Sequence, residues 1–328
     1  MKRITLLIPS LLLLAMLSAC VPVETAPAPE PMSEEAAVDA VASQEITHET
    51  GTTTIEGVPE RIVVLEYSFA DNLGTLSVAP VGYAVDSMPD YLLPFTAEVG
   101  AEEVGTRAEP SLETIAALSP DLIIGDSRRH TEIYDKLSEI APTVIFNSLR
   151  GSYQDQLDTF QLIAQILDKE AEAADLLSTY EETFAATVGE TNPDAGEFVI
   201  GVLWSGGYTA HSNESFMGSF MESLGRTNAL SPQDGETQYV LELEGLASIN
   251  PSTIVILCAP SDQAVFDELQ AQPVWQSIDA AQNNQVYLFD RNLWSKGRGV
   301  MAYEAILQDA VDSGLLAETE STTGMACP

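Results

Sequence analysis

The chain has 328 residues, with 50 Asp and Glu against 13 Lys and Arg, and its formal net charge at pH 7 is −37. This excess of negative charge excludes nucleic acid and anionic membrane surfaces as general binding partners. The length is enough for one large domain or two medium ones.

The first 19 residues are typical of a signal peptide. Two basic residues precede an apolar run, residues 4–16, that is too short to span a bilayer. Leu-Ser-Ala-Cys follows at residues 17–20 and looks like a bacterial lipoprotein box. We therefore expect Cys20 to carry lipid and to hold the protein at the outer face of the cytoplasmic membrane, on the cell surface or in the periplasm. The segment 20–44 is rich in Pro, Ala and Glu and is predicted to be a disordered linker.

Residues 45–168 alternate between strand and helix patterns. Short apolar runs predict buried strands, and helical spacing of apolar residues falls between them. The expected strands are a hairpin at 45–55 and runs at 61–65, 80–83, 122–124 and 143–146; the expected helices open at Ser68 and cover 112–118 and 132–140. This alternation favours a largely parallel sheet covered by helices on both faces.

A long helical pattern separates this region from a second α/β region. Residues 153–188 contain neither proline nor glycine, which predicts one or two unusually long helices, with 169–190 as a bridging helix. The second region, 191–318, predicts strands at 198–204, 254–256 and 285–289 and helices at 216–224 and 299–311. Residues 319–328 are predicted to be a tail.

A short motif occurs twice. Leu112–Pro120 and Leu243–Pro251 share Glu, Ile or Leu, Ala and Pro in register, and each precedes a β-rich apolar run. We interpret this as an α/β fold with two similar lobes of mostly parallel sheet, joined by a single long bridging helix. The ligand site would lie between the lobes.

The few basic residues are concentrated where strands or turns end. Seven of the eleven that remain after the signal peptide have this position: Arg107, Arg128, Arg129, Arg150, Arg291, Lys296 and Arg298. Open α/β sheets bind ligands beyond the carboxyl ends of their strands, and a guanidinium group matches a carboxylate. The pattern predicts an anion site, although some of these arginines could instead pair with the abundant acidic residues.

Two further observations refine this site. Arg128 and Arg129 open a predicted helix, where positive charge opposes the helix dipole, so a compensating anion is expected. Trp294 is flanked by Lys296 and Arg298 and is expected to line the site.

No motif points to catalysis or to a resident metal. His48, His130 and His211 are widely separated, and no His-x-x-x-His or Cys-x-x-Cys spacing occurs. A Gly-x-Ser-x-Gly motif and a phosphate loop are also missing, so we expect no enzyme, no cofactor and no direct metal ligand. Cys258 and Cys327 could form a disulfide or remain free thiols.

Several segments resemble a known family. They are IVVLEYSFAD (62–71), VGTRAEPSLE (104–113), PDLII (120–124) and WSKGRG (294–299). Over about residues 45–313 the chain resembles the iron-siderophore substrate-binding lipoproteins of ABC importers, nearest to the members that bind ferric dicitrate. The resemblance implies a type III periplasmic-binding fold, with two lobes, one long connecting helix and the ligand in the cleft.

The resemblance also implies roles for individual residues. The positions at which the family contacts its iron chelate correspond to Arg107, Arg129, Trp294 and Arg298. The predicted ligand-binding set is completed by Tyr67, Ser68, Arg128, Arg150 and Trp204. Glu113 and Glu244, the repeated acids, match surface glutamates that dock each lobe onto arginines of the permease.

The predicted function is the capture of an anionic ferric chelate. Ferric citrate, or a citrate-based or hydroxamate siderophore, would be delivered by a monomeric, lipid-anchored protein to the permease and ATPase of an importer. Two alternatives stay open: binding of cobalamin or haem by the same fold, and direct binding of a metal ion.

Overall fold

The structure is a computed structural model that describes residues 43–321 and 323–328. These residues belong to one compact unit. The predicted signal peptide, Cys20 and nearly all of the predicted linker lie outside the described residues. Within the described ranges, no helix combines the length and the apolar character that crossing a membrane requires.

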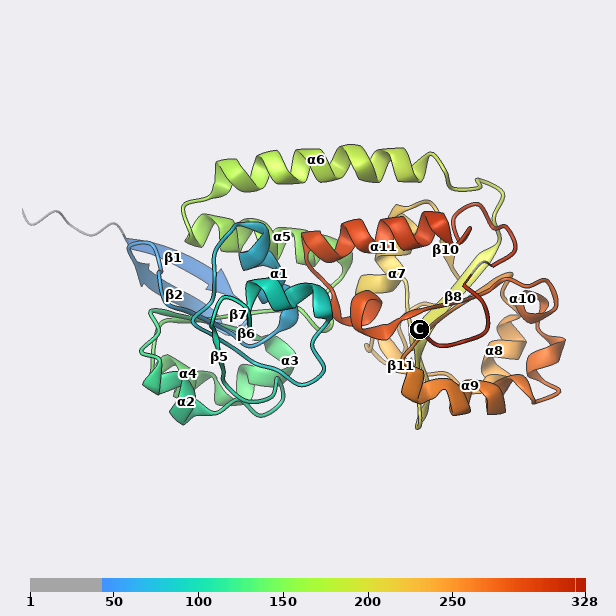
Figure 1. Ribbon diagram of the computed structural model, residues 1–328, viewed down its shortest axis with the longest axis horizontal. Coiled ribbons are helices and arrows are strands. Elements are labelled where there is room, and N and C mark those ends of the chain that lie inside the picture. Colours follow the sequence, from blue (N-terminus) through green and yellow to red (C-terminus); the bar gives the residue numbers. More distant parts are fainter. Residues whose placement is uncertain (1–42, 322) are drawn as a thin grey trace, which may run out of the picture. The chain divides into compact units, whose positions relative to one another are not determined.

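The N-terminal half, here residues 43–168, contains a hairpin and a parallel sheet (Figure 1). The predicted hairpin forms from β1 (Ser43–His48) and β2 (Gly51–Glu56), which pair antiparallel. The sheet has the order β5 (Glu102–Glu103), β4 (Gly82–Tyr83), β3 (Ile62–Val64), β6 (Leu122–Asp126) and β7 (Thr143–Phe146). All of its pairings are parallel, as the alternation of strands and helices predicted.

The C-terminal half, here residues 191–328, contains a mixed sheet. Its order is β11 (Gln238–Val240), β9 (Gly207–His211), β8 (Glu197–Trp204), β12 (Thr253–Cys258) and β13 (Val286–Asp290), and β10 (Thr227–Asn228) also pairs with β8. The three strands predicted from sequence, β8, β12 and β13, pair parallel. β9 runs antiparallel to both β8 and β11, which the sequence pattern did not predict.

Helices cover both faces of both sheets. In the N-terminal half they are α1 (Tyr67–Thr75), α2 (Leu112–Ala117), α3 (Ser127–His130), α4 (Tyr134–Ser138) and α5 (Tyr153–Ile166). α6 (Glu170–Val188) follows, and the C-terminal half contains α7 (Phe216–Ser223), α8 (Leu243–Ile249), α9 (Gln263–Gln270), α10 (Asp279–Gln282) and α11 (Val300–Asp312). A short π-helical segment, η5 (Asn292–Lys296), precedes α11.

The pleat of each sheet divides its side chains between two cores. In β3, Val64 belongs to a core that extends through both halves, whereas Val63 faces a separate core on the other side. In β12, Val255 belongs to the shared core and Ile254 to a core of the C-terminal half. The two halves are therefore joined by a continuous apolar layer that includes residues of α1, α5, α6, α7 and α11.

α6 is the long helix predicted at 169–190. It packs against α5 and α11, as Figure 1 shows, and buries Leu177 and Tyr180. The helix is thus part of the shared layer and does not stand free as a strut. That α6 alone bridges two lobes, with the boundaries given above, stays a prediction.

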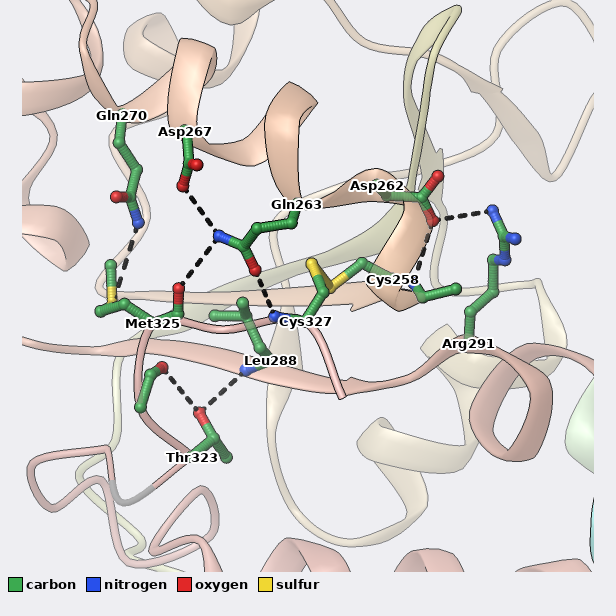
Figure 2. The surroundings of a disulfide bond; sticks show 12 residues. Cys258, Asp262, Gln263, Asp267, Gln270, Leu288, Arg291, Thr323, Met325 and Cys327 are labelled. Atoms are coloured by element: carbon green, nitrogen blue, oxygen red, sulfur yellow. Dashed lines mark hydrogen bonds and ion pairs between the residues drawn. A yellow bond between two sulfur atoms is a disulfide. The ribbon is translucent and has the colours of Figure 1, made fainter.

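The described residues of the predicted tail pack onto the C-terminal half. Cys327 forms a disulfide with Cys258 of β12, and its backbone N–H donates to Gln263 at the start of α9 (Figure 2). Thr323 accepts a hydrogen bond from the backbone of Leu288 in β13. These contacts attach the end of the chain to two neighbouring strands.

Candidate functional site

A cluster of charged side chains lies beyond the carboxyl ends of the N-terminal strands. Glu66 follows β3, Asp86 follows β4 and Arg107 follows β5, while Asp126 ends β6 and leads into Arg129. Because parallel strands all end at the same edge of the sheet, residues distant in sequence meet there. The arginines predicted from sequence are part of this cluster, together with acidic residues that were not predicted.

Arg107 is held by two carboxylates and an aromatic ring. Its Nη1 lies 3.2 Å from Glu66 Oε2, and its Nε and Nη2 both bond to Asp86, at 3.0 to 3.2 Å. Its guanidinium carbon lies 4.1 Å from the centre of the Tyr67 ring, in cation–π geometry. The side chain is 8% exposed, so its orientation is fixed by these contacts.

The loop that carries Arg107 has its own supports. Gly105 has φ of +97°, and a Cβ there would lie 2.8 Å from the carbonyl oxygen of Glu109, so the tight turn requires glycine. His130 Nε2 donates to the carbonyl of Arg107, while its Nδ1 accepts from the backbone N–H of Asp126. Burial lowers the pKa of His130, which favours this neutral ring.

Glu66 connects two of the predicted arginines. Its other oxygen, Oε1, pairs with Arg129 Nη1, so one carboxylate bridges Arg107 and Arg129. The Glu66 side chain is 1% exposed, whereas that of Arg129 is 21% exposed. The Arg129 side chain therefore stays partly accessible to solvent.

The anion expected at the start of α3 belongs to the chain itself. Asp126 Oδ1 accepts from the backbone N–H groups of Arg128 and Arg129, at 3.0 and 3.1 Å. Its Oδ2 accepts from Ser148 and Leu149. The compensating anion at this helix end is therefore the carboxylate of Asp126, which caps the helix.

A carboxylate from the C-terminal half contacts two more of the predicted arginines. Glu236 lies 3.7 Å from Arg128 Nη2 and 3.6 Å from Arg150 Nη2. Both separations exceed ordinary hydrogen-bond length, and all three side chains are partly exposed. Such pairs contribute about 0.2–1 kcal/mol each.

Arg298 approaches the same cluster from the C-terminal half. Its residue is 5% exposed, and in the part of the chain that the structure describes its guanidinium has no hydrogen bond or ion pair. Burial lowers the pKa of Arg298 to about 10; Glu66 opposes this effect, and the charges of Arg107 and Arg129 add to it. Arg298 is thus a charged, unpaired group close to the N-terminal arginines.

The two remaining cations of the predicted group, Lys296 and Arg291, have different contacts. Lys296 Nζ donates to the carbonyl of Ser87 at 2.8 Å, which links η5 to the loop after β4. Arg291 pairs with Asp262 at 3.1 Å and is not part of the cluster's contacts. Of the two options left open from sequence, pairing with acids is thus realised for most of these cations.

The prediction for Trp294 is wrong. Its ring is 0% exposed, stacks on Phe289 at 4.1 Å and donates its Nε1–H to Asp309 of α11. The π-helical turn of η5 places this ring in the core, although polar neighbours flank it in sequence.

The other non-arginine residues of the predicted set are placed differently from expectation. Tyr67 and Ser68 are each 1% exposed; Tyr67 donates to Asp86, and Ser68 bonds to Ser148. We correct their role to positioning the charged cluster. Trp204 is 42% exposed at the end of β8 and donates to Thr209, and its contact with a ligand stays a prediction.

The two predicted docking residues occupy corresponding places. Glu113 is in the first turn of α2 and Glu244 in the first turn of α8. Both are exposed, and among the described residues neither has a hydrogen bond or ion pair. Their role in docking stays a prediction.

The histidines do not form a metal site. His48 bonds to Thr53 and Thr50 in the hairpin, His130 supports Arg107, and His211 ends β9. Within residues 43–321 and 323–328, no group of three His, Cys, Asp or Glu side chains is arranged to hold a metal ion.

Comparison with known proteins identifies the family. A model of the family described as periplasmic binding protein matches residues 62–293. The chain belongs to the periplasmic binding protein family. The resemblance inferred from sequence is confirmed.

Two bacterial relatives of this periplasmic binding protein are similar over most of their length. The chain is 35% identical over 271 residues to the Fe(3+)-citrate-binding protein YfmC of Bacillus subtilis (strain 168), covering 82% of this chain and 85% of the relative. It is 36% identical over 271 residues to the Fe(3+) dicitrate-binding periplasmic protein FecB of Escherichia coli (strain K12), covering 81% and 88%.

Solved structures confirm the fold. Staphylococcus aureus SirA complexed with staphyloferrin B superposes with a TM-score of 0.73 at 24% identity, covering 84% of this chain and 100% of that one. Bacillus subtilis FeuA complexed with ferri-bacillibactin also gives a TM-score of 0.73, at 20% identity. At this identity the likeness establishes architecture alone.

Proposed function

We propose that this periplasmic binding protein captures an anionic ferric chelate, of the ferric citrate class, between its two halves. The observation that carries the proposal is that buried Arg298, from one half, lies near enough to Arg107 and Arg129 of the other half for their charges to lower its pKa. Both relatives described above are named for ferric citrate or dicitrate, and both exceed one third identity. The bound iron would be cargo, held through its carboxylate-rich ligand.

The charge balance of the cluster suits such a ligand. Its cations outnumber its carboxylates, with Arg107, Arg128, Arg129, Arg150, Lys296 and Arg298 on one side and Glu66, Asp86, Asp126 and Glu236 on the other. A charged hydrogen bond contributes about 1.5–3 kcal/mol. Three such contacts would account for much of the roughly 8 kcal/mol of a micromolar complex.

Entry of the ligand requires the halves to separate locally. The contacts between them at this place are the Glu236 pairs, Lys296 to Ser87, and Gln238 Nε2 to the carbonyl of Leu149 at 3.1 Å. These are few, partly exposed and polar, so a chelate that supplies carboxylates can replace them at small cost.

The cluster is less suited to haem or cobalamin. Those ligands present large apolar faces, whereas the cluster is built from paired arginine and carboxylate side chains. Direct metal binding has no suitable set of ligands among the described residues.

We further propose the transport context. Lipid attached at Cys20 would hold the protein on the outer face of the cytoplasmic membrane, where it acts as a non-enzymatic monomer. Glu113 and Glu244 would dock it onto the permease of an ABC importer.

The proposal is tested by equilibrium dialysis of the mature chain against a panel of ligands. The panel contains ferric citrate, a ferric trihydroxamate, haem, cobalamin and Zn²⁺. We expect ferric citrate to bind most tightly, in the micromolar range or below. Retention of haem, cobalamin or Zn²⁺ with no retention of ferric citrate would refute the proposal.

A further inference from the structure

One edge of each sheet is formed by the second strand after the repeated motif. In the N-terminal half the motif leads into β6, and β7 lies beyond β6 at the edge; in the C-terminal half it leads into β12, and β13 lies beyond β12. The strands β7 and β13 therefore occupy equivalent places. An edge strand presents unpaired backbone groups on which another chain can add a strand, so each of these edges needs a cover.

The edge of β7 is covered by the first described residues of the chain. The N–H of Glu49, in the turn between β1 and β2, donates to the carbonyl of Ile145 at 2.9 Å. Thr53 of β2 donates its hydroxyl to the carbonyl of Thr143 at 2.7 Å. The hairpin thus uses backbone groups of β7 that β6 leaves free.

The edge of β13 is covered by the tail (residues 319–328). The N–H of Leu288 donates to the hydroxyl of Thr323 at 3.0 Å, as Figure 2 shows. The N–H of Ser321 donates to the carbonyl of Asn284, just before β13, at 3.0 Å. Because backbone groups alternate along a strand, Val286 presents its own on the same side as Leu288. The tail therefore lies where a further strand would pair.

The two covers are held in different ways. The hairpin is a pair of six-residue strands in continuous antiparallel register. None of the described tail residues forms a strand, and residues 324–326 are exposed. The start of the tail is held by Gln285, which donates to the carbonyl of Thr319, and its end by the disulfide between Cys327 and Cys258 (Figure 2). The cover of β13 therefore depends on the disulfide.

Release of the tail would also uncover apolar side chains. A hollow of about 240 Å³ lies beneath it, lined by Trp275, Ala281 and Val286 of the C-terminal half and by Met325 of the tail. Trp275 and Val286 are each 3% exposed with the tail in place. A free strand edge beside an apolar surface is what an added strand requires.

We propose that the tail is a disulfide-anchored cover that keeps β13 from pairing with a second copy of this chain. The partner is a second copy because two free β13 edges can satisfy each other about a two-fold axis, and attachment to one membrane would bring copies together. The disulfide forms in an oxidising compartment, so the cover closes after export. The net charge of −37 opposes the pairing and gives a second protection, which salt weakens.

The test uses two variants of the mature chain. Cys258→Ala with Cys327→Ala releases the end of the tail, and a chain that ends at Glu320 and carries Cys258→Ala lacks the cover. Size-exclusion chromatography with light scattering gives the mass at about 10 and 200 μM protein, in about 0.15 and 0.5 M NaCl. We expect the wild type to be monomeric throughout. Both variants should form dimers at the higher concentration, and more of them at the higher salt.

Hydrogen exchange locates the contact. In the monomeric variants the amide of Leu288 should exchange at least about tenfold faster than in the wild type, and in their dimers it should be protected again. Thr323→Val removes the acceptor of this amide but keeps the disulfide, so it is the matched control and should stay monomeric.

The outcomes are decisive for the cover and leave the proposed function separate. Variants that keep their circular dichroism spectrum and stay monomeric under all four conditions overturn the proposal. Dimers that leave the amides of β13 unprotected overturn it too, as does a Thr323→Val variant that dimerises. Loss of the folded spectrum in both variants would show that the tail belongs to the core and is no cover. Affinity for ferric citrate should be the same in the wild type and in the monomeric variants.

Discussion

At the scale of single residues, four of the five arginines that were predicted as ligand contacts are already engaged by carboxylates, and Arg298 is the exception among the described residues. Glu66 bridges Arg107 and Arg129, and Asp86 holds Arg107 a second time. Removing Arg107 would leave Glu66 and Asp86 short of a partner, so its substitution should reduce stability as well as affinity. Arg129 is more exposed, which makes it the cleaner probe of ligand binding.

Glu236 provides a prediction at this scale. Its carboxylate lies beside the guanidinium groups of Arg128 and Arg150, at distances too long for good hydrogen bonds. We therefore expect a ligand carboxylate to displace it. Glu236→Gln removes this competitor and should tighten ferric citrate binding about two- to tenfold, as measured by calorimetric titration. Asp234→Asn, in the same turn and exposed, is the matched control. Weaker binding by Glu236→Gln would show instead that Glu236 holds the halves closed.

At the scale of elements, Asp71 joins the two halves by capping a helix across them. It lies in α1, and its carboxylate accepts from the backbone N–H groups of Met301 and Ala302 in the first turn of α11. Tyr91 donates to the same carboxylate. A Cβ on Gly299 would lie 2.2 Å from Asp71 Oδ1, so glycine is required for this close approach.

A pH dependence follows from this cap. Burial raises the pKa of Asp71 from 3.8 to about 6, and the hydrogen bonds from Tyr91 and α11 offset only part of that rise. Because the folded chain binds this proton more tightly than the unfolded chain, Asp71 contributes most to stability below its ordinary pKa. That contribution is lost as pH rises through about 6.

The measurement compares wild type with Asp71→Asn, which cannot titrate. The difference in their free energies of unfolding should shift against the wild type by about 2 kcal/mol between pH 4 and pH 7, as followed by urea denaturation. A difference that stays constant over this range would show that Asp71 does not titrate there.

Most elements could be predicted from sequence because their signals are local. The apolar runs at β3, β6, β7, β8, β12 and β13 and the helical spacing of α5 and α6 do not depend on distant residues. What the pattern missed depends on long-range contacts. The antiparallel β9 and β11, the pairing of Glu66 with two arginines, and the packing of the tail through Cys327 all join residues far apart in sequence.

The candidate site could be predicted only in part, because its side-chain contacts also join residues that are far apart in sequence. Residue type and position at the ends of strands or turns selected seven cations, and the family resemblance singled out Arg107, Arg129 and Arg298 among them. Sequence position alone could not show which side chains face inward. Trp294 was predicted to line the site but is buried, because the π-helical turn of η5 has no simple sequence pattern. Glu66 could have been suspected, since it directly follows the strand that begins the family motif.

At the scale of the whole molecule, the repeated motif places one exposed glutamate on each half. Glu113 begins α2 and Glu244 begins α8, and neither has a partner among the described side chains. If they dock the protein onto a permease, the double variant Glu113→Gln with Glu244→Gln should bind ferric citrate normally and lose at least about nine tenths of iron uptake by cells. Glu139→Gln with Glu304→Gln, exposed acids elsewhere on each half, is the control. Normal uptake by the first pair would remove both residues from docking.

The central claim is that cations from both halves hold one anionic chelate. It is tested most directly by the dissociation constants for ferric citrate of the wild type, Arg129→Ala and Arg298→Met. Arg61→Ala is the control, because its guanidinium bonds to the backbone carbonyls of Leu118 and Ser119. We predict that the first two substitutions each weaken binding at least about tenfold, the loss of one charged contact, while the control has no effect. Undiminished affinity in either Arg129→Ala or Arg298→Met would contradict a site shared between the halves.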